Sequence, residues 1–284
     1  MGKTFTEKLL AAQMKNSSCV CVGLDPDKKR ILSDGDKGGV AKRKLGDFCK
    51  RIIKKTAAIA CAFKLNFGFY LNFVPGDPAA GIEVLGRIIK FIEENYPDIP
   101  IILDYKAGDI GNSALQYAEA AFSGFGVDAV TINDYLGSNS VFEFLKLGFA
   151  FGLCKTSNPS SGEFQDFPET GTTPVTQLYQ RVAELSAEWR NEYPESGIVF
   201  GATYPEQLAE ICGEYPDMPM LLPGIGKQEG DLEATIEAVA GNNAEDRPFV
   251  INSSRGIIYA DDPDIAARTL CHKINKLLPD GFYG

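Results

Sequence analysis

Histidine is nearly absent from this chain of 284 residues, which has only one, His272. A metal site built from several histidines is therefore excluded, and a Ser-His-Asp triad would have to use this one residue. Basic side chains are also in the minority, since the chain has 28 lysines and arginines but 38 acidic residues. Its formal net charge is therefore -10. This balance argues against a protein that binds nucleic acid or an anionic membrane surface.

Paired cysteines and long apolar runs are missing as well. The seven cysteines are scattered, and no two of them form a C-x-x-C motif of the kind that binds zinc or cycles as a dithiol. We expect reduced thiols in a cytoplasmic protein. No segment has the roughly 20 apolar residues of a membrane span. The first residues lack the apolar core of a signal peptide and predict a short amphipathic helix at about 3–15.

Short apolar runs recur along the whole chain and predict strands. They are continuous rather than alternating, which is typical of parallel strands covered on both faces. The eight runs are 19–24, 60–67, 99–105, 128–133, 149–156, 197–203, 218–224 and 248–254.

Amphipathic stretches follow these runs and predict helices at 45–58, 80–95, 112–123, 139–147, 175–192, 205–213, 231–240 and 263–278. Eight alternating units predict an α/β fold, the (β/α)8 TIM barrel, as a single domain over 1–284. The rival architecture, an open doubly wound sheet, needs a glycine fingerprint or phosphate loop after the first strand, and GLDPDKK (23–29) has neither.

Two polar segments rich in Gly, Pro, Ser and Asp predict long loops, at 26–44 and 157–172. Loops that follow strands carry function in such barrels, so 157–172 is a candidate lid.

The strongest chemical signal is ILDYKAGDIGNS (102–113), where an apolar strand ends in charged residues. Asp104 and Lys106 are two residues apart on a strand and so share one face, which is predicted to point into the barrel mouth. Asp109 is predicted to open the next helix, with Ser113 on the same side one turn later. Charged side chains at the end of a barrel strand are costly to desolvate unless they form ion pairs or have a catalytic role. The alternative is a helix cap beside a surface ion pair.

A second lysine ends the preceding strand, where ACAFKLNF places Lys64 and Asn66 on one face. A buried lysine needs a carboxylate, and Asp104 stands on the neighbouring strand. We therefore predict a chain of alternating charges from Lys64 through Asp104 and Lys106 to Asp109. Such a chain would keep a lysine protonated and fix its orientation.

Glycine-rich turns follow the last two strands, in LLPGIGKQ (221–228) and VINSSRGI (250–257). Exposed N–H groups at this place form the usual phosphate site of the barrel, and Gln228 and Arg255 supply side-chain donors. A phosphomonoester clamp is predicted, although glycines at these positions also suit plain turns.

These motifs, together with CKTSNP and GATYPE, resemble the orotidine 5′-phosphate decarboxylase family, in particular its longer type 2 subfamily, over nearly the whole chain. The resemblance implies conversion of orotidine 5′-monophosphate to uridine 5′-monophosphate and carbon dioxide, the last step of de novo pyrimidine nucleotide synthesis. It further implies that neither a cofactor nor a metal is needed, and that the enzyme is a homodimer with shared active sites.

Residue by residue, the resemblance implies a catalytic tetrad of Lys64, Asp104, Lys106 and Asp109, with Asp109 reaching into the neighbouring subunit's site. It also implies substrate contacts: Asp25 and Asn66 to the ribose, Thr156 and Ser157 to the pyrimidine, Pro223 to the ring wall, and Gln228 and Arg255 to the phosphate. Ser113 stands where the family usually has threonine, and it keeps the hydroxyl needed for a ribose contact.

The chemistry agrees with these residues. Loss of carbon dioxide from the ring leaves a carbanion in the ring plane, which the π system cannot delocalise, so the protein must supply a cation. Lys106 is predicted to stabilise this charge and then to protonate the carbon. The alternatives are a sugar-phosphate decarboxylase or hexulose-phosphate synthase on the same barrel, or a non-catalytic nucleotide-binding barrel, which we would expect to have lost one of the four charges.

Overall fold

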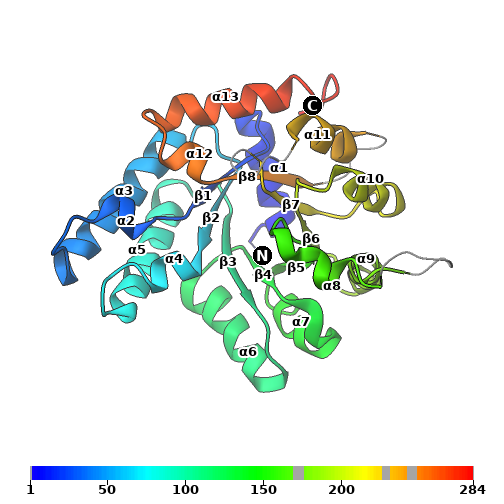
Figure 1. Ribbon diagram of the computed structural model, residues 1–284, viewed down its shortest axis with the longest axis horizontal. Coiled ribbons are helices and arrows are strands. Elements are labelled where there is room, and N and C mark those ends of the chain that lie inside the picture. The colour runs from blue at the N-terminus through cyan, green and yellow to red at the C-terminus, as the bar shows by residue number, and fades with distance from the viewer. Residues whose placement is uncertain (1, 169–175, 226–230, 242–247, 284) are drawn as a thin grey trace.

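The computed structural model describes residues 2–168, 176–225, 231–241 and 248–283. Eight parallel strands close into a barrel in chain order, with β1 paired to β8 (Figure 1). Each strand overlaps its expected run, which confirms the predicted (β/α)8 barrel. The strands are β1 Val20–Leu24, β2 Ala62–Asn66, β3 Ile101–Ala107, β4 Ala129–Ile132, β5 Phe149–Lys155, β6 Ser196–Phe200, β7 Met220–Pro223 and β8 Phe249–Ser253.

Helices surround the strands on the outside (Figure 1). Within the described residues, no helix combines the length and apolar character needed to cross a membrane. The α-helices are α1 Phe5–Asn16, α2 Lys28–Ile31, α3 Gly38–Thr56, α4 Phe67–Leu71, α5 Pro78–Asn95, α6 Gly111–Glu119, α7 Ser138–Leu145, α8 Gly162–Gln165, α9 Leu178–Arg190, α10 Pro205–Glu214, α11 Leu232–Ala240, α12 Arg255–Ile258 and α13 Pro263–Asn275. Shorter turns are the π-helix η1 Ala120–Phe125 and the 3-10 helices η2 Asp134–Leu136 and η3 Pro159–Ser161.

Two apolar layers hold the barrel together. The larger lies between the strands and the helices, and helix α3 contributes to it with a stripe spaced three or four residues apart, the spacing of one helix face. The buried residues of this stripe are Ala41, Leu45, Cys49, Ile52, Ile53 and Thr56. The smaller layer fills the barrel interior, where Phe149 and Phe151 of β5 meet side chains from the other strands.

Helix α1 closes the far end of the barrel in Figure 1. Thr4 begins it with a capping box, in which Thr4 and Glu7 each accept a hydrogen bond from the other's backbone. Its first residue, Phe5, enters the interior layer with its ring centroid 4.4 Å from that of Phe149. The helix lies where the short amphipathic helix was expected, and it leaves the opposite, carboxyl end of the strands open.

Two predicted loops contain helices. In 26–44, the Asp27 carboxylate caps α2, and α3 begins at Gly38 rather than at 45. The helix prediction began too late because it relied on large apolar residues and overlooked Ala41, a small residue that continues the buried stripe. In 157–172, η3 and α8 occupy 159–165, and the residues from 169 to 175 lie outside the described part.

Candidate active site

A cavity of about 550 Å³ opens at the carboxyl ends of the strands. This is the face where the loops of such barrels carry function. The structure brings most of the predicted site residues to its wall: Asp25, Lys64, Asn66, Asp104, Lys106, Thr156, Ser157, Pro223 and Arg255.

A buried carboxylate joins the two lysines. Lys64 Nζ donates to one oxygen of Asp104 at 2.6 Å, and Lys106 Nζ donates to the other at 2.5 Å. Asn66 Nδ2 adds a longer contact of 3.5 Å. The side chain of Lys64 is 4% exposed and that of Asp104 8%, whereas that of Lys106 is 45% exposed. The inner pair is thus shielded from water, and the outer ammonium faces the cavity.

The charges in this cluster stabilise one another. Burial by itself would raise the pKa of Asp104, but Lys64 and Lys106 together hold that pKa well below its usual range. Burial would likewise lower the pKa of Lys64, but Asp104 and Asp25 outweigh it and raise that pKa above its usual range. The carboxylate therefore stays ionised and the inner lysine stays protonated near neutral pH.

Lys106 does not follow the regular strand that its spacing predicted. Its φ angle is +50°, in the left-handed region, and the pairing of β3 with β4 is irregular between Leu103 and Ala107. The side chains of Asp104 and Lys106 do meet, but through this irregular stretch rather than through a shared pleat. Because the irregularity displaces the backbone, the N–H of Lys106 donates to the Thr131 hydroxyl at 3.1 Å.

Thr131 is a functional candidate that the sequence reasoning missed. It is buried in β4, and its hydroxyl donates to Asp104 Oδ1 at 2.9 Å while accepting from the backbone of Lys106. Thr131 therefore contacts both partners of the ion pair between Asp104 and Lys106. The available signal was a single hydroxyl within an apolar strand adjacent to the charged one.

Asp109 and Ser113 lie outside the cavity wall of their own chain. Helix α6 begins at Gly111 after an N-cap at Ile110, so Asp109 does not open the helix as predicted. Its carboxylate instead accepts from the N–H of Ile110 at 2.8 Å, and its carbonyl accepts from the Ser140 hydroxyl. The ion-pair chain within one subunit thus runs from Lys64 to Lys106 and does not include Asp109.

The cavity has one wall built from the segment after β5 and another from the ends of β7 and β8. On the first, the Thr156 N–H donates to Gln165 Oε1 at 2.9 Å, and both residues face the cavity. On the second, Pro223 and Arg255 line the wall. Gln228 lies outside the described residues, so its predicted phosphate contact stays a prediction.

Oδ1 of Asp25 and Oδ1 of Asn252, two buried oxygens of cavity-lining residues, have no hydrogen-bond partner among the residues that the structure describes. Unpartnered buried oxygens are rare in folded proteins and often mark functional sites. Asn252 is a second site residue that the sequence reasoning missed. Within the described ranges, no group of three or more His, Cys, Asp or Glu side chains is arranged to hold a metal ion.

Comparisons with known proteins identify the family of the chain. A family model, "Orotidine 5'-phosphate decarboxylase / HUMPS family", matches residues 18–270. An orotidine 5′-phosphate decarboxylase of Ralstonia pickettii is 41% identical over 265 residues, which is 92% of each chain. The solved OMP decarboxylase of Leishmania donovani has a TM-score of 0.81 and 33% identity, with 97% of this chain and 98% of that chain covered.

The solved UMP synthase of Leishmania donovani has a TM-score of 0.83 and 34% identity. The match covers 97% of this chain but only 57% of the UMP synthase, so this chain corresponds to part of that longer protein. On the family match and the Ralstonia relative, this chain belongs to the orotidine 5′-phosphate decarboxylase / HUMPS family.

Proposed function

We propose that this protein converts orotidine 5′-monophosphate to uridine 5′-monophosphate and carbon dioxide, without a cofactor. The observation that carries the proposal is the ion-pair chain Lys64–Asp104–Lys106, with its outer ammonium facing a cavity of nucleotide size. The name of the Ralstonia relative supports the choice of substrate.

In this mechanism the bond between the ring carbon and the carboxylate breaks, and its electron pair stays on the ring carbon. The ammonium of Lys106 stabilises that charge and then transfers one of its protons to the carbon. Asp104 orients the ammonium through their 2.5 Å hydrogen bond. Lys64 keeps Asp104 ionised, in agreement with the lowered pKa of that carboxyl.

The wall after β5 would bind the ring, while the wall at the ends of β7 and β8 would bind the phosphate and, through Pro223, would also contact the ring. We assign the phosphate to Arg255 and Gln228, the ribose to Asp25 and Asn66, and the ring to Thr156, Ser157 and Pro223. Binding energy from the phosphate, remote from the bond that breaks, then offsets the cost of placing the substrate carboxylate beside Asp104.

We further propose a homodimer in which Asp109, and Ser113 with it, completes the partner's site. Both residues lie outside their own cavity wall. Apolar side chains are exposed on the same segment and on the turn after β4, and such a patch is typical of an interface: Ile110, Tyr117, Tyr135 and Leu136. Leu136 lies next to Gly108, which joins the patch to the segment that carries Asp109.

We place the protein in the cytoplasm, as the sequence suggested. All seven cysteines lie within the described residues and are free thiols, and six of them are buried. Unpaired cysteines in this number are typical of a reducing compartment.

The test is turnover of orotidine 5′-monophosphate by the purified protein in the presence of a metal chelator, followed by ultraviolet absorbance. We expect full activity with the chelator. Lys106→Met should lower kcat by at least about 10⁴-fold, because it removes both the cation and the proton donor, while uridine 5′-monophosphate still binds. A chelator-sensitive activity on a sugar phosphate would instead identify the protein as the sugar-phosphate relative.

A further inference from the structure

A second buried lysine, Lys155, ends β5 on the side opposite to the cavity. It directly precedes Thr156, yet its own side chain is completely buried and does not line the cavity. A fully buried ammonium is costly to desolvate unless its surroundings compensate for the loss of water. The proposed mechanism does not use this residue, so its burial calls for another explanation.

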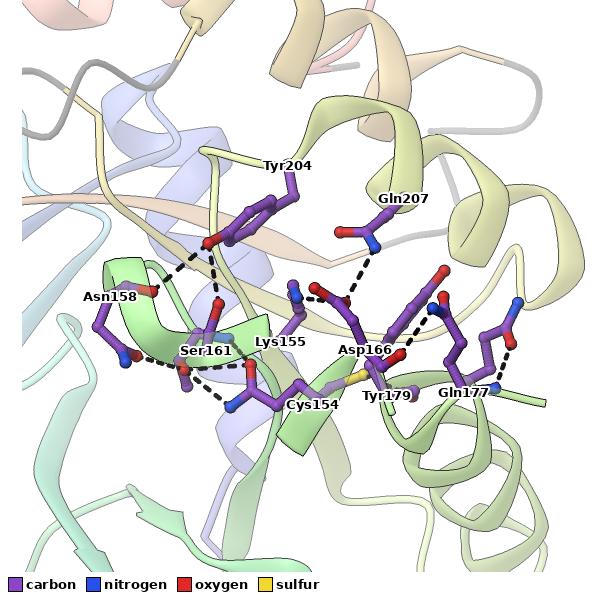
Figure 2. A network of polar contacts seen from close by, with 12 residues as sticks. Cys154, Lys155, Asn158, Ser161, Asp166, Gln177, Tyr179, Tyr204 and Gln207 are labelled. Atoms are coloured by element: carbon purple, nitrogen blue, oxygen red, sulfur yellow. Dashed lines mark hydrogen bonds and ion pairs between the residues drawn. The ribbon is translucent and has the colours of Figure 1, made fainter. Parts of the chain in front are cut away.

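Lys155 is held by one carboxylate and two aromatic rings (Figure 2). Its ammonium forms an ion pair with Asp166, which follows α8. It also lies 4.5 Å from the ring centroid of Tyr204 and 5.8 Å from that of Tyr179. Both rings are close enough for cation–π attraction. The lysine therefore links the end of β5 to the segment beyond α8.

Asp166 is anchored from two further helices (Figure 2). Gln207 of α10 donates to its carboxylate at 3.2 Å, and Gln177, the N-cap of α9, donates to its carbonyl at 2.9 Å. Tyr204 also contacts Ser161, with their hydroxyls 2.9 Å apart. These contacts, made by residues that do not line the cavity, fix the segment 156–168 to the barrel.

The residue next to Asp166 faces the cavity. The Gln165 amide accepts from the N–H of Thr156 and donates to its hydroxyl, each at 2.9 Å. Lys155–Asp166 and Thr156–Gln165 are thus two neighbouring bridges across the same loop, one behind the wall and one on it. A shift of Asp166 would displace Gln165, and with it the hydroxyl and amide groups that line the cavity.

We infer that Lys155 and Asp166 are positioning residues: their ion pair places Thr156 and Gln165 so that this wall binds the base of the nucleotide. The inference rests on the proposed function. The inference predicts that loss of the ion pair affects only one part of the ligand, because Arg255 lies on the opposite wall and does not depend on this pair. Loss of the pair should weaken binding of the base but not of the sugar phosphate.

The experiment compares dissociation constants for uridine 5′-monophosphate and ribose 5-phosphate, which lacks the base. For Asp166→Asn we expect the constant for uridine 5′-monophosphate to rise about tenfold and that for ribose 5-phosphate to stay within about twofold. Asp166→Glu restores the charge and should recover most of the affinity. Lys155→Met should show the same selective loss. In this variant Asp166 lacks its ion-pair partner, but its side chain is 32% exposed and can be solvated.

Asp98→Asn is the matched control, since it breaks the Lys15–Asp98 pair, in which both side chains are well exposed. It should change neither constant. Equal weakening of both ligands in Asp166→Asn and Lys155→Met, or unchanged binding of uridine 5′-monophosphate, would overturn the inference while leaving the proposed function intact. A wild-type protein that neither binds uridine 5′-monophosphate nor turns over orotidine 5′-monophosphate would overturn both.

Discussion

At position 106 a lysine adopts a backbone conformation that residues with a Cβ seldom take. A φ angle of +50° costs roughly 1–2 kcal/mol for such a residue. The hydrogen bonds of Thr131 to Lys106 and to Asp104 help to offset this cost. Strain at this position is consistent with a site where orientation matters more than stability.

Replacing Thr131 by valine keeps the shape of the side chain and removes both hydrogen bonds. We expect Thr131→Val to lower kcat by about tenfold through loss of Lys106 positioning, with little change in KM. Thr131→Ser keeps the hydroxyl and should retain most of the activity. Steady-state kinetics on orotidine 5′-monophosphate checks both variants, and a wild-type kcat in Thr131→Val would show that the hydroxyl does not position the ammonium.

Among the elements, the turn η2 after β4 contains an unusual acid, Asp134. The residue is buried, and neither carboxylate oxygen has a hydrogen-bond partner in the described structure. Gly152 makes room for it, since a Cβ at that position would lie 1.9 Å from Asp134 Oδ2. Burial raises the pKa of Asp134 to about 7, from an ordinary value of 3.8.

This raised pKa links stability to pH. The folded protein binds the Asp134 proton more tightly than the unfolded chain does, so this contribution to stability is fully present below pH 3.8 and is lost as the pH rises to about 7. The free energy of unfolding is thereby lower above pH 7 than below pH 3.8, by at most about 4 kcal/mol. Above neutrality the fold contains an unpaired buried carboxylate.

Asp134→Asn removes the ionisation and keeps the size. We expect the variant to be more stable than the wild type at pH 8.5 and to lose this advantage towards pH 5. Urea denaturation at a series of pH values measures the difference, in which the titration of all other groups cancels. A constant difference across this range would show that Asp134 does not titrate there.

On the scale of the whole molecule, the site that we propose is shared between two chains. Lys106 lines the cavity of its own chain, whereas Asp109 lies outside it, in a region of exposed apolar side chains. In the twofold dimer that we propose, each Asp109 would reach the partner's cavity, and the same surface would serve both subunits. The segment after β3 would then contribute to two sites at once.

A mixed-dimer experiment tests this arrangement. Chains with Lys106→Ala or Asp109→Ala should each be nearly inactive alone. After the two are unfolded, mixed equally and refolded, we expect roughly a quarter of the wild-type activity, since half of the dimers are hybrids with one intact site in two. Absence of any recovery, with hybrid dimers demonstrated by mass spectrometry, would show that the sites are not shared.

The sequence by itself determined the architecture and the central ion pairs. Continuous apolar runs predict all eight strands, because a parallel strand buried on both faces requires them. Lys64 and Asp104 are predicted to pair from the residue pattern alone, because they end neighbouring parallel strands and a buried charge needs a partner. Arg255 was predicted at the cavity for a different reason, because it follows the eighth strand, where such barrels usually bind phosphate.

Only the tertiary structure decided how these groups are held. Thr131 was missed because a single hydroxyl in an apolar strand gives no periodic signal, and its role depends on an irregular β3–β4 pairing. Lys155 was missed because Asp166, Tyr179 and Tyr204 meet around it from separate loops and helices. Local patterns record which side of an element is apolar. The irregular backbone and the packing of distant segments depend on the whole fold.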